Sequence, residues 1–252
     1  MKVTQIRNAT LVVEYAGKKF LIDPFLADKG TYPPFPNSLR QDQKNPLVSL
    51  PTSLDNMINV DAVIVTHLHL DHFDDVAREI LPKDIKIFVQ NEEDAIEMRN
   101  AGFRHVEVLQ VDTVFETIHL IKTEGEHGRG EILKLAGQVC GVVFKHQTEK
   151  TLYVAGDTVW YEGVHKAIDT YKPEIIVVNA GDNQFFQGGS LVMGKEDVYE
   201  VYQAAPHAKI IAVHMEAVNH WTLSREELKS FTKEKGISSS VLVPDDGESY
   251  EF

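Results

Sequence analysis

The side chains best suited to chemistry lie in the stretch 67–72, whose sequence His-Leu-His-Leu-Asp-His directly follows a strand-like apolar run. On an extended backbone His67 and His69 project to the same side, because side chains alternate along a strand. Asp71 and His72 are adjacent and diverge, so they reach the same cavity only if the chain turns into a helix. The residues Phe73–Ile80 predict that helix, since apolar side chains recur there with helical spacing. Such a ligand set suits two neighbouring divalent ions.

With the preceding threonine, the stretch 66–72 resembles the signature of the metallo-β-lactamase-fold hydrolases. The resemblance implies an α/β (α+β) fold, a four-layered αβ/βα sandwich of two mixed β-sheets flanked by helices, in one domain over residues 1–252. Periodicity alone shows only alternating strands and helices. The size of the chain, its Leu-Ile-Asp-Pro strand and its Asn-Ala-Gly loop look most like the bacterial branch that includes the sugar-phosphate lactonases.

Three later residues resemble the remaining ligands of this family. His127 lies among glycines, Asp157 follows an apolar strand, and His214 follows the buried-looking run from Lys209. His220, a little further on, competes with His214 for the last position. The resemblance therefore implies one ion held by His67, His69 and His127, a second held by Asp71, His72 and His214, and Asp157 as the bridge between them.

Other residues are candidates for supporting roles. Asp23 closes an apolar strand before a proline, so it either forms a turn or, as in the family, lies behind the ligands and orients them. Arg129 either holds an anionic substrate group or is solvated. Asn183 and Phe186 lie in a glycine-rich loop after a buried strand, where substrates bind in open sheets. His220 is a further candidate for contact with the substrate.

Residues 26–56 are irregular and rich in proline, and they form either a cover over the active site or a packed surface loop. The sequence does not decide between these alternatives. The run around Cys140 is apolar, so a core thiol is preferred to a ligand there.

The resemblance implies metal-dependent hydrolysis of an ester, lactone or phosphoester bond by a hydroxide that bridges two ions. Asp71 and Asp157 are the expected catalytic carboxylates, and Asp71 is a candidate proton relay. Zinc is the preferred metal, with manganese or iron as alternatives. Two other functions stay open: a phosphodiesterase or RNA-processing nuclease of the same fold, and a metal-binding sensor or scaffold without catalysis.

Composition and charge limit the classes of molecule that this protein can bind. The 252 residues carry a net charge of −13, which argues against a surface for nucleic acid but leaves a small anionic substrate open. The single cysteine excludes an intrachain disulfide and fits a reducing compartment. Without a signal peptide or a long apolar run, we expect a cytoplasmic protein with a small-molecule substrate, no membrane contact and an open oligomeric state.

Overall fold

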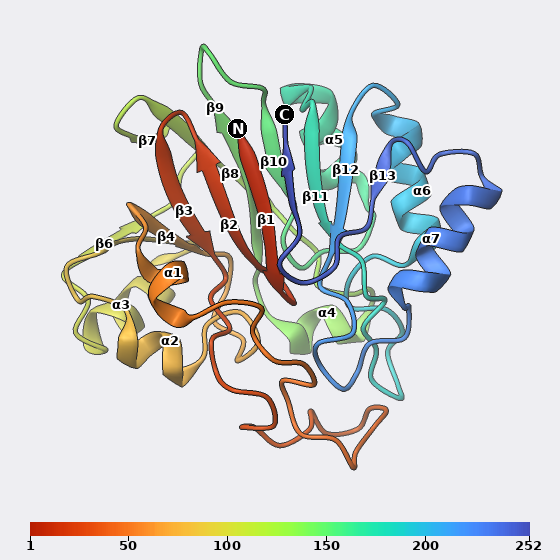
Figure 1. The fold of residues 1–252 in the computed structure, drawn as a ribbon, viewed down its shortest axis with the longest axis horizontal. Helices are drawn as coiled ribbons and strands as arrows, with labels where there is room; N and C mark the ends of the chain where they lie inside the picture. The colour runs from red at the N-terminus through yellow and green to blue at the C-terminus, as the bar shows by residue number, and fades with distance from the viewer.

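The computed structural model describes all 252 residues. Two seven-stranded sheets pack face to face, and helices cover both outer faces (Figure 1). This confirms the four-layered α/β sandwich that the resemblance implied. The single domain over residues 1–252 stays a prediction. No helix has both the length and the apolar character needed to span a bilayer.

The first sheet has the strand order β14-β1-β2-β3-β4-β5-β6. Strands β1 to β3 are antiparallel, and β3 to β6 are parallel. Its elements are β1 (Lys2–Arg7), β2 (Thr10–Tyr15), β3 (Lys18–Ile22), β4 (Ala62–Val65), β5 (Lys86–Val89), β6 (His105–Val108) and β14 (Ser249–Glu251), covered by α1 (Leu54–Ile58), α2 (Asp75–Ile80) and α3 (Glu92–Asn100). A cluster of 16 buried apolar residues joins this sheet to its helices.

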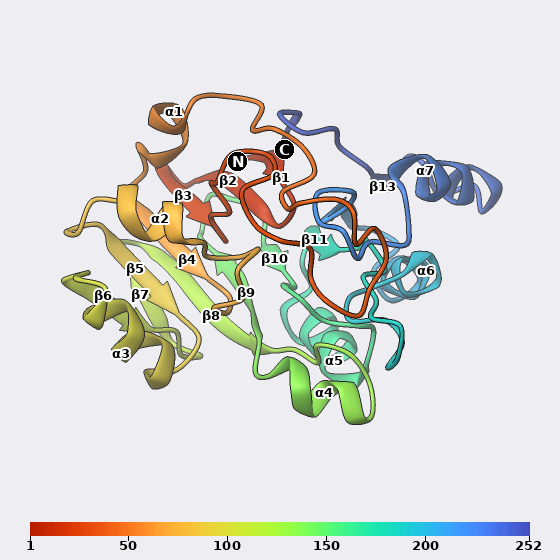
Figure 2. The ribbon, with the colours of Figure 1, turned by 90° about the horizontal axis from the view of Figure 1, so that it is seen from below.

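The second sheet has the order β13-β12-β11-β10-β9-β8-β7. Its strands are β7 (Thr113–Phe115), β8 (Ile118–Glu124), β9 (Cys140–Lys145), β10 (Leu152–Val154), β11 (Ile175–Asn179), β12 (Lys209–Val213) and β13 (Val241–Leu242). Its outer face is covered by α5 (Glu162–Tyr171), α6 (Lys195–Ala204) and α7 (Arg225–Glu234). The short helix α4 (Glu131–Ala136) lies apart from them, at the loop edge seen from below in Figure 2.

A core of 21 buried apolar residues fills the space between the two sheets. The rings of Phe20 and Phe144 meet there edge to face, with centroids 5.2 Å apart. The Tyr15 hydroxyl donates to the Phe144 carbonyl at 3.1 Å, so the buried phenol is satisfied. Cys140 is fully buried in this core, as predicted, and burial raises the pKa of its thiol to about 12.

Strands β10, β11 and β12 are parallel to one another, so their carboxyl ends fall at one edge of the second sheet. The carboxyl end of β4 lies at the same edge of the sandwich, since the carbonyl of Thr66 accepts a hydrogen bond from the amide of Cys140, at the start of β9, which is antiparallel to β10. Every residue of β4, β10 and β11 is buried, which explains their unbroken apolar sequences. The loops that leave these carboxyl ends carry the candidate ligands. The rigid sheets therefore fix the backbone positions from which these side chains extend.

One predicted boundary is wrong. Helix α2 begins at Asp75 and not at Phe73, because the Asp74 side chain caps it by accepting a hydrogen bond from the amide of Ala77. The chain thus carries Asp71 and His72 in a turn before the helix. Strand β12 ends at Val213, because His214 has a left-handed backbone with φ of 61°. Helix α4 and strand β14 were not predicted.

Candidate metal centre

Seven side chains converge at this edge, four from the stretch 67–72 and three from the second sheet. The possible ligand atoms of His67, His69 and His127 all lie within 4.8 Å of one another. The same holds for His67, His72 and Asp157, and for Asp71, His72 and His214. We call these seven residues the ligand cluster.

Asp23 orients two of the histidines from behind. One of its oxygens accepts a hydrogen bond from the backbone amide of Thr66 and the other from the Thr66 hydroxyl, each at 2.7 Å. The second oxygen also lies 2.8 Å from Nδ1 of His72. The Thr66 hydroxyl in turn lies 3.1 Å from Nδ1 of His67. Both rings therefore use Nδ1 for the scaffold and keep Nε2 free for a metal.

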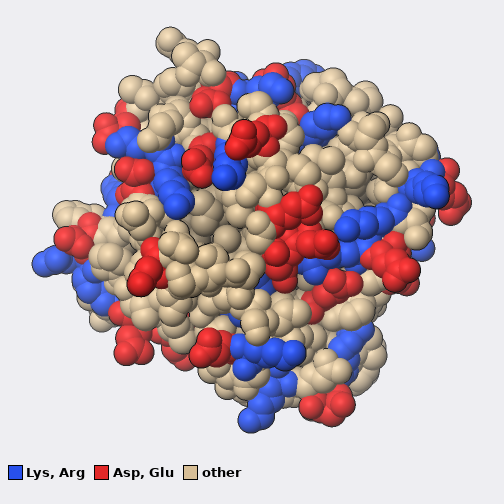
Figure 3. Space-filling model, in the orientation of Figure 1, with Lys and Arg blue, Asp and Glu red and all other residues tan.

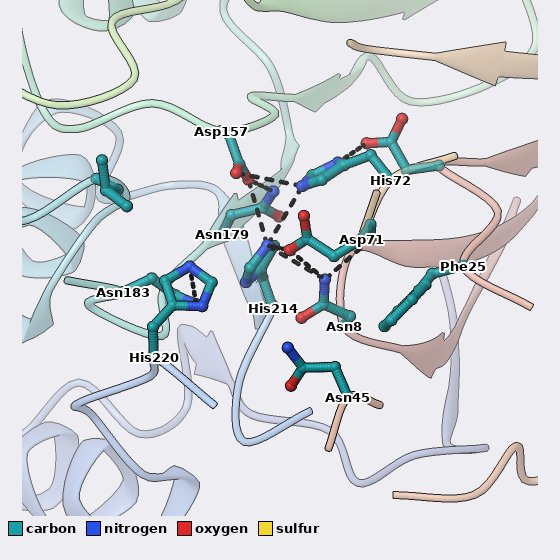
Figure 4. A network of polar contacts seen from close by, with 12 residues as sticks. Asn8, Phe25, Asn45, Asp71, His72, Asp157, Asn179, Asn183, His214 and His220 are labelled. Atoms are coloured by element: carbon teal, nitrogen blue, oxygen red, sulfur yellow. Dashed lines mark hydrogen bonds and ion pairs between the residues drawn. The ribbon is translucent and has the colours of Figure 1, made fainter. Parts of the chain in front are cut away.

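Asp157 lies between the two ligand groups. Its Oδ2 is 3.2 Å from Nε2 of His72, 3.6 Å from Nε2 of His127 and 4.0 Å from Nε2 of His67. Its Oδ1 accepts a hydrogen bond from the amide of Asn179, at the end of β11 (Figure 4). Because Gly156 has φ of 71° and a Cβ there would meet the Cys140 carbonyl at 2.5 Å, only glycine suits the turn that delivers this carboxylate.

His127 is held by the backbone of the loop 180–194. Its Nδ1 donates to the carbonyl of Leu191 at 2.9 Å, which leaves Nε2 toward Asp157. The predicted third histidine therefore lies where the family resemblance placed it. The loop 180–194, which contributes Leu191, is thus part of the support for the ligand cluster.

The structure brings His214, and not His220, into the ligand cluster. Nε2 of His214 lies 3.3 Å from Oδ2 of Asp71 and 3.3 Å from Nε2 of His72. The amide of Asn8 donates to the backbone carbonyl and to Oδ2 of Asp71, both at 3.1 Å. His220 belongs to none of the three groups.

Asn8 and Asn179 were missed by the sequence analysis. Asn179 had a usable signal, because it is a polar residue at the end of a fully buried strand, the same position that identified Asp157. Asn8 had none, since it lies in a short turn between two strands with no distinctive pattern.

The charges in the cluster are strongly coupled. Burial alone would lower the pKa of His72, but Asp157 and Asp23 outweigh it and raise that pKa well above its ordinary value. Burial likewise opposes protonation of His214, and the carboxylates, Asp157 foremost, raise its pKa. The pKa of Asp157 is held well below its usual range, because His72 and His214 outweigh the effect of burial. In the protein without metal, the positive charge of protonated His72 and His214 therefore offsets the negative charge of the ionised carboxylates.

One buried atom indicates that a metal cation satisfies the ligand cluster better than protons alone do. Nε2 of His67 has no hydrogen-bond partner in the protein, although the ring is buried. Burial, and then the neighbouring His72, lower the pKa of His67 well below its ordinary value, so the ring is neutral and its lone pair is available. Neutral imidazoles together with carboxylates form a donor set that zinc, manganese and iron accept.

A pocket of about 690 Å³ opens above the ligand cluster. His69, Asp71, His127 and Asp157 line it, and we call them the pocket floor. The other lining residues form the pocket wall. They are mainly apolar and include Phe35, Ile132, Leu135, Phe185, Phe186 and His220. No lysine or arginine is among them.

Two of the four predicted substrate residues line this pocket, Phe186 and His220. Asn183 lies behind the wall, with its amide 3.3 Å from Nε2 of His220. The structure places Arg129 outside the pocket lining, and the prediction that it holds an anionic substrate group stays a prediction. Its guanidinium donates to the Trp160 carbonyl at 2.9 Å and pairs with Asp197 at 3.3 Å, outside the pocket.

Part of the irregular loop reaches the pocket as well. Phe35, Pro36 and Asn37 line it. The side chain of Asn219 fastens this part of the loop, because it accepts from the amide of Phe35 at 2.8 Å and donates to the Leu39 carbonyl at 2.7 Å. Residues 35–37 thus belong to the pocket wall.

Comparison with known proteins identifies the family of this chain. Residues 18–215 match the family described as the beta-lactamase superfamily domain. The protein YddR of Bacillus subtilis, described as a UPF0173 protein, is 71% identical over 254 residues, covering 100% of both chains. The chain belongs to the beta-lactamase superfamily and to its UPF0173 family.

Other members of the superfamily support this assignment. A UPF0173 metal-dependent hydrolase of Pyrococcus furiosus is 24% identical over the full length of both chains. The crystal structure of an isothiocyanate hydrolase from Delia radicum gut bacteria matches with a TM-score of 0.96 and 45% identity, covering 100% of this chain and 99% of that one. A possible metal-dependent hydrolase from Veillonella parvula matches with a TM-score of 0.97 and 42% identity, at the same coverage.

Membership of the superfamily confirms the predicted fold family and the predicted class of enzyme, metal-dependent hydrolases. The finer resemblance to the sugar-phosphate lactonases stays a prediction, as do the roles assigned to individual residues.

Proposed function

We propose that this protein uses two divalent ions, held by the ligand cluster, to hydrolyse a neutral small molecule at an electrophilic carbon. The observation that carries the proposal is the combination of floor and wall. Seven groups able to bind metal converge beneath a pocket whose wall is mainly apolar and whose lining includes no lysine or arginine.

The chemistry of the floor follows from its residues. When bound, the two ions would lower the pKa of a shared solvent molecule enough to supply hydroxide near neutral pH. His67, His69 and His127 would hold one ion, and Asp71, His72 and His214 the other. Asp157 would bridge them, since its Oδ2 faces histidines of both groups. Asp71, at the pocket surface, is the candidate proton relay.

The wall favours a neutral substrate with an apolar body. A phosphate or carboxylate group is normally paired with arginine or lysine, and the lining residues offer neither. Aromatic and aliphatic side chains would instead bury a hydrocarbon portion of the substrate. The wall therefore favours a neutral substrate over the anionic one that the net charge leaves open.

Within neutral substrates, we propose an isothiocyanate as the first class to test and a lactone as the second. The gut-bacterial protein that is 45% identical to this chain is described as an isothiocyanate hydrolase. An isothiocyanate carries an electrophilic carbon between nitrogen and sulfur and has no charge, which suits the pocket. A lactone shares these properties through its carbonyl carbon.

A nuclease is a weaker alternative. On the face drawn in Figure 3, lysine and arginine side chains are interspersed with aspartate and glutamate and form no continuous basic surface. With a net charge of −13, this distribution does not favour a polyanion. A sensor or scaffold without catalysis is disfavoured by the open pocket, which gives the ligand cluster access to a small molecule.

The test combines metal analysis with a substrate panel. Protein loaded with zinc or manganese is expected to hold close to two ions per chain by elemental analysis. It is then assayed against an aralkyl isothiocyanate, a lactone, a phosphodiester and a β-lactam. We expect turnover of a neutral substrate, lost with chelator and restored by added ion. Preference for the phosphodiester would favour the nuclease, and no turnover by the fully loaded protein would favour the scaffold.

A further inference from the structure

His220 is a buried polar residue of the pocket wall. Its side chain is 6% exposed and lines the pocket, whereas Asn37 and Gln187, the other hydrogen-bonding residues of the wall, are exposed. It takes no part in the ligand cluster. A buried imidazole in a mainly apolar wall therefore calls for an explanation.

Aromatic contacts fix the ring of His220. The ring of Phe185 stacks on it at 5.7 Å with an interplanar angle of 10°. The ring of Phe35 meets it edge to face at 4.9 Å. Its backbone carbonyl accepts from the amide of Gln184 at 2.9 Å. Two parts of the pocket wall thus hold the ring in place, and the hydrogen bond from Gln184 fixes the backbone that carries it.

The hydrogen bonds of the ring leave one nitrogen free. The side-chain amide of Asn183 lies 3.3 Å from Nε2 of His220 and donates to it (Figure 4). An imidazole that accepts at Nε2 carries its proton on Nδ1. Nδ1 of His220 has no hydrogen-bond partner in the protein and is buried. An unpaired buried donor is costly, so a partner supplied from the pocket would be favourable.

The ring is also neutral at physiological pH. Burial lowers the pKa of His220 to about 4, although the carboxylate of Asp71 opposes this shift. A neutral ring can donate a hydrogen bond without giving up its proton. It therefore suits stabilisation of developing negative charge better than proton transfer.

We propose that His220 donates a hydrogen bond from Nδ1 to the substrate heteroatom that gains negative charge when the neighbouring carbon is attacked. The proposal rests on the proposed function. The proton stays on Nδ1 throughout, so no group is transferred through this residue. Asn183 acts as a positioning residue, because its amide fixes which ring nitrogen carries the proton.

The decisive variants are His220→Phe, which keeps a ring but removes the donor, and His220→Gln, which keeps a donor. His207→Phe is the matched control, since His207 is exposed and away from the pocket. For the metal-loaded protein we expect His220→Phe to lower kcat by about 10²- to 10³-fold, the range for loss of one such donor. KM and metal content should change little, and His220→Gln should recover part of kcat.

A binding measurement tests the same inference without turnover. N-butylacetamide is a neutral carbonyl compound that resists hydrolysis, and its affinity for the metal-loaded protein can be measured by titration calorimetry. We expect His220→Phe to weaken binding about tenfold, as for loss of one hydrogen bond, and His220→Gln to weaken it less.

The outcomes separate this inference from the proposed function. A wild-type protein that turns over no substrate contradicts the proposed function, while the calorimetry still decides on His220. Equal affinity and equal kcat in wild type and His220→Phe would overturn the inference. Loss of an ion in His220→Phe would also overturn it, because His220 would then be a metal ligand.

Discussion

The floor and the wall of the pocket are built in opposite ways. The floor consists of two imidazoles and two carboxylates, and three of these four groups are held by a buried neighbour: Asp71 by Asn8, Asp157 by Asn179 and His127 by Leu191. The wall consists of loops and one short helix, and it exposes large apolar side chains, with Phe186 67% and Leu135 81% exposed. The floor residues follow the ends of rigid strands, whereas most wall residues lie in loops away from the strand ends.

This difference assigns the two regions different tasks. A ligand cluster must be held within fractions of an ångström, so it needs strand ends and buried hydrogen bonds around it. A substrate wall needs only shape and polarity, which loops can change without disturbing the sheets. We infer that the floor determines the reaction and the wall determines the substrate.

The largest expected effect tests the floor directly. Asp157→Asn keeps the shape of the side chain but removes the charge between the two ligand groups. We expect kcat/KM to fall by about 10³-fold or more, with loss of at least one ion, while circular dichroism shows an intact fold. Asp197→Asn is the control, because that carboxylate pairs with Arg129 outside the pocket. A variant that kept both ions and its activity would show that Asp157 is not a ligand.

The support behind the floor should matter next most. Asn179→Leu removes the donor to Oδ1 of Asp157 but leaves every ligand in place. We expect metal affinity to fall by about 10- to 100-fold, as for other partners of ligands, measured by competition with a fluorescent chelator. Asn100→Leu, at the exposed end of α3, is the control. An unchanged affinity would mean that the strand end alone positions the carboxylate.

The stability of chelated protein should depend on pH in two opposing directions. The raised pKa values of His72 and His214 give stability that is present below about pH 6.5, the unfolded value, and is lost as the pH rises through the folded values. The lowered pKa values of His67 and His69 act oppositely, and cost stability as the pH falls below about 6.5.

Because these two pairs of histidines oppose each other, chelated protein should be most stable at about pH 6 to 7. Thermal unfolding measured from acidic to mildly alkaline pH checks this expectation. Adding zinc should remove the loss of stability at high pH, because metal binding favours neutral imidazoles. A stability that changed in only one direction with pH would mean that one pair of histidines dominates the ligand cluster.

The smallest expected effect concerns the wall. Phe186→Ala removes an exposed ring from the pocket mouth, so the fold should not suffer. For a substrate with a phenyl group we expect KM to rise about threefold to tenfold, from lost apolar contact. For methyl isothiocyanate, KM should stay unchanged. Val114→Ala, on the edge strand β7, is the control. An equal effect on both substrates would contradict the inference that the wall determines the substrate.

The same division separates what the sequence predicted from what it did not. The stretch 67–72 was recognisable because four candidate ligands lie within six residues. His127, Asp157 and His214 were recognisable because they follow glycine-rich or apolar segments in the order known for the family. Buried strands such as β11 were recognisable from their continuous apolar sequence.

The wall could not be predicted, because tertiary contacts create it. The position of Phe35 depends on Asn219, 184 residues further along the chain. Arg129 is two residues from His127 in sequence, yet its side chain points to Trp160 and Asp197. Helix α4 was missed because its six residues lie between glycines in a loop, with too little periodicity to detect.

The pairing of the last strand with the first has a consequence for synthesis in the cell. Glu251 of β14 pairs with Lys2 of β1, and the two strands run side by side in Figure 1. Strand β1 must therefore keep one edge open until residue 251 has left the ribosome. An open strand edge invites pairing with other chains. Slow translation of the residues between β1 and β14 would lengthen that exposure. Faster translation should therefore reduce aggregation.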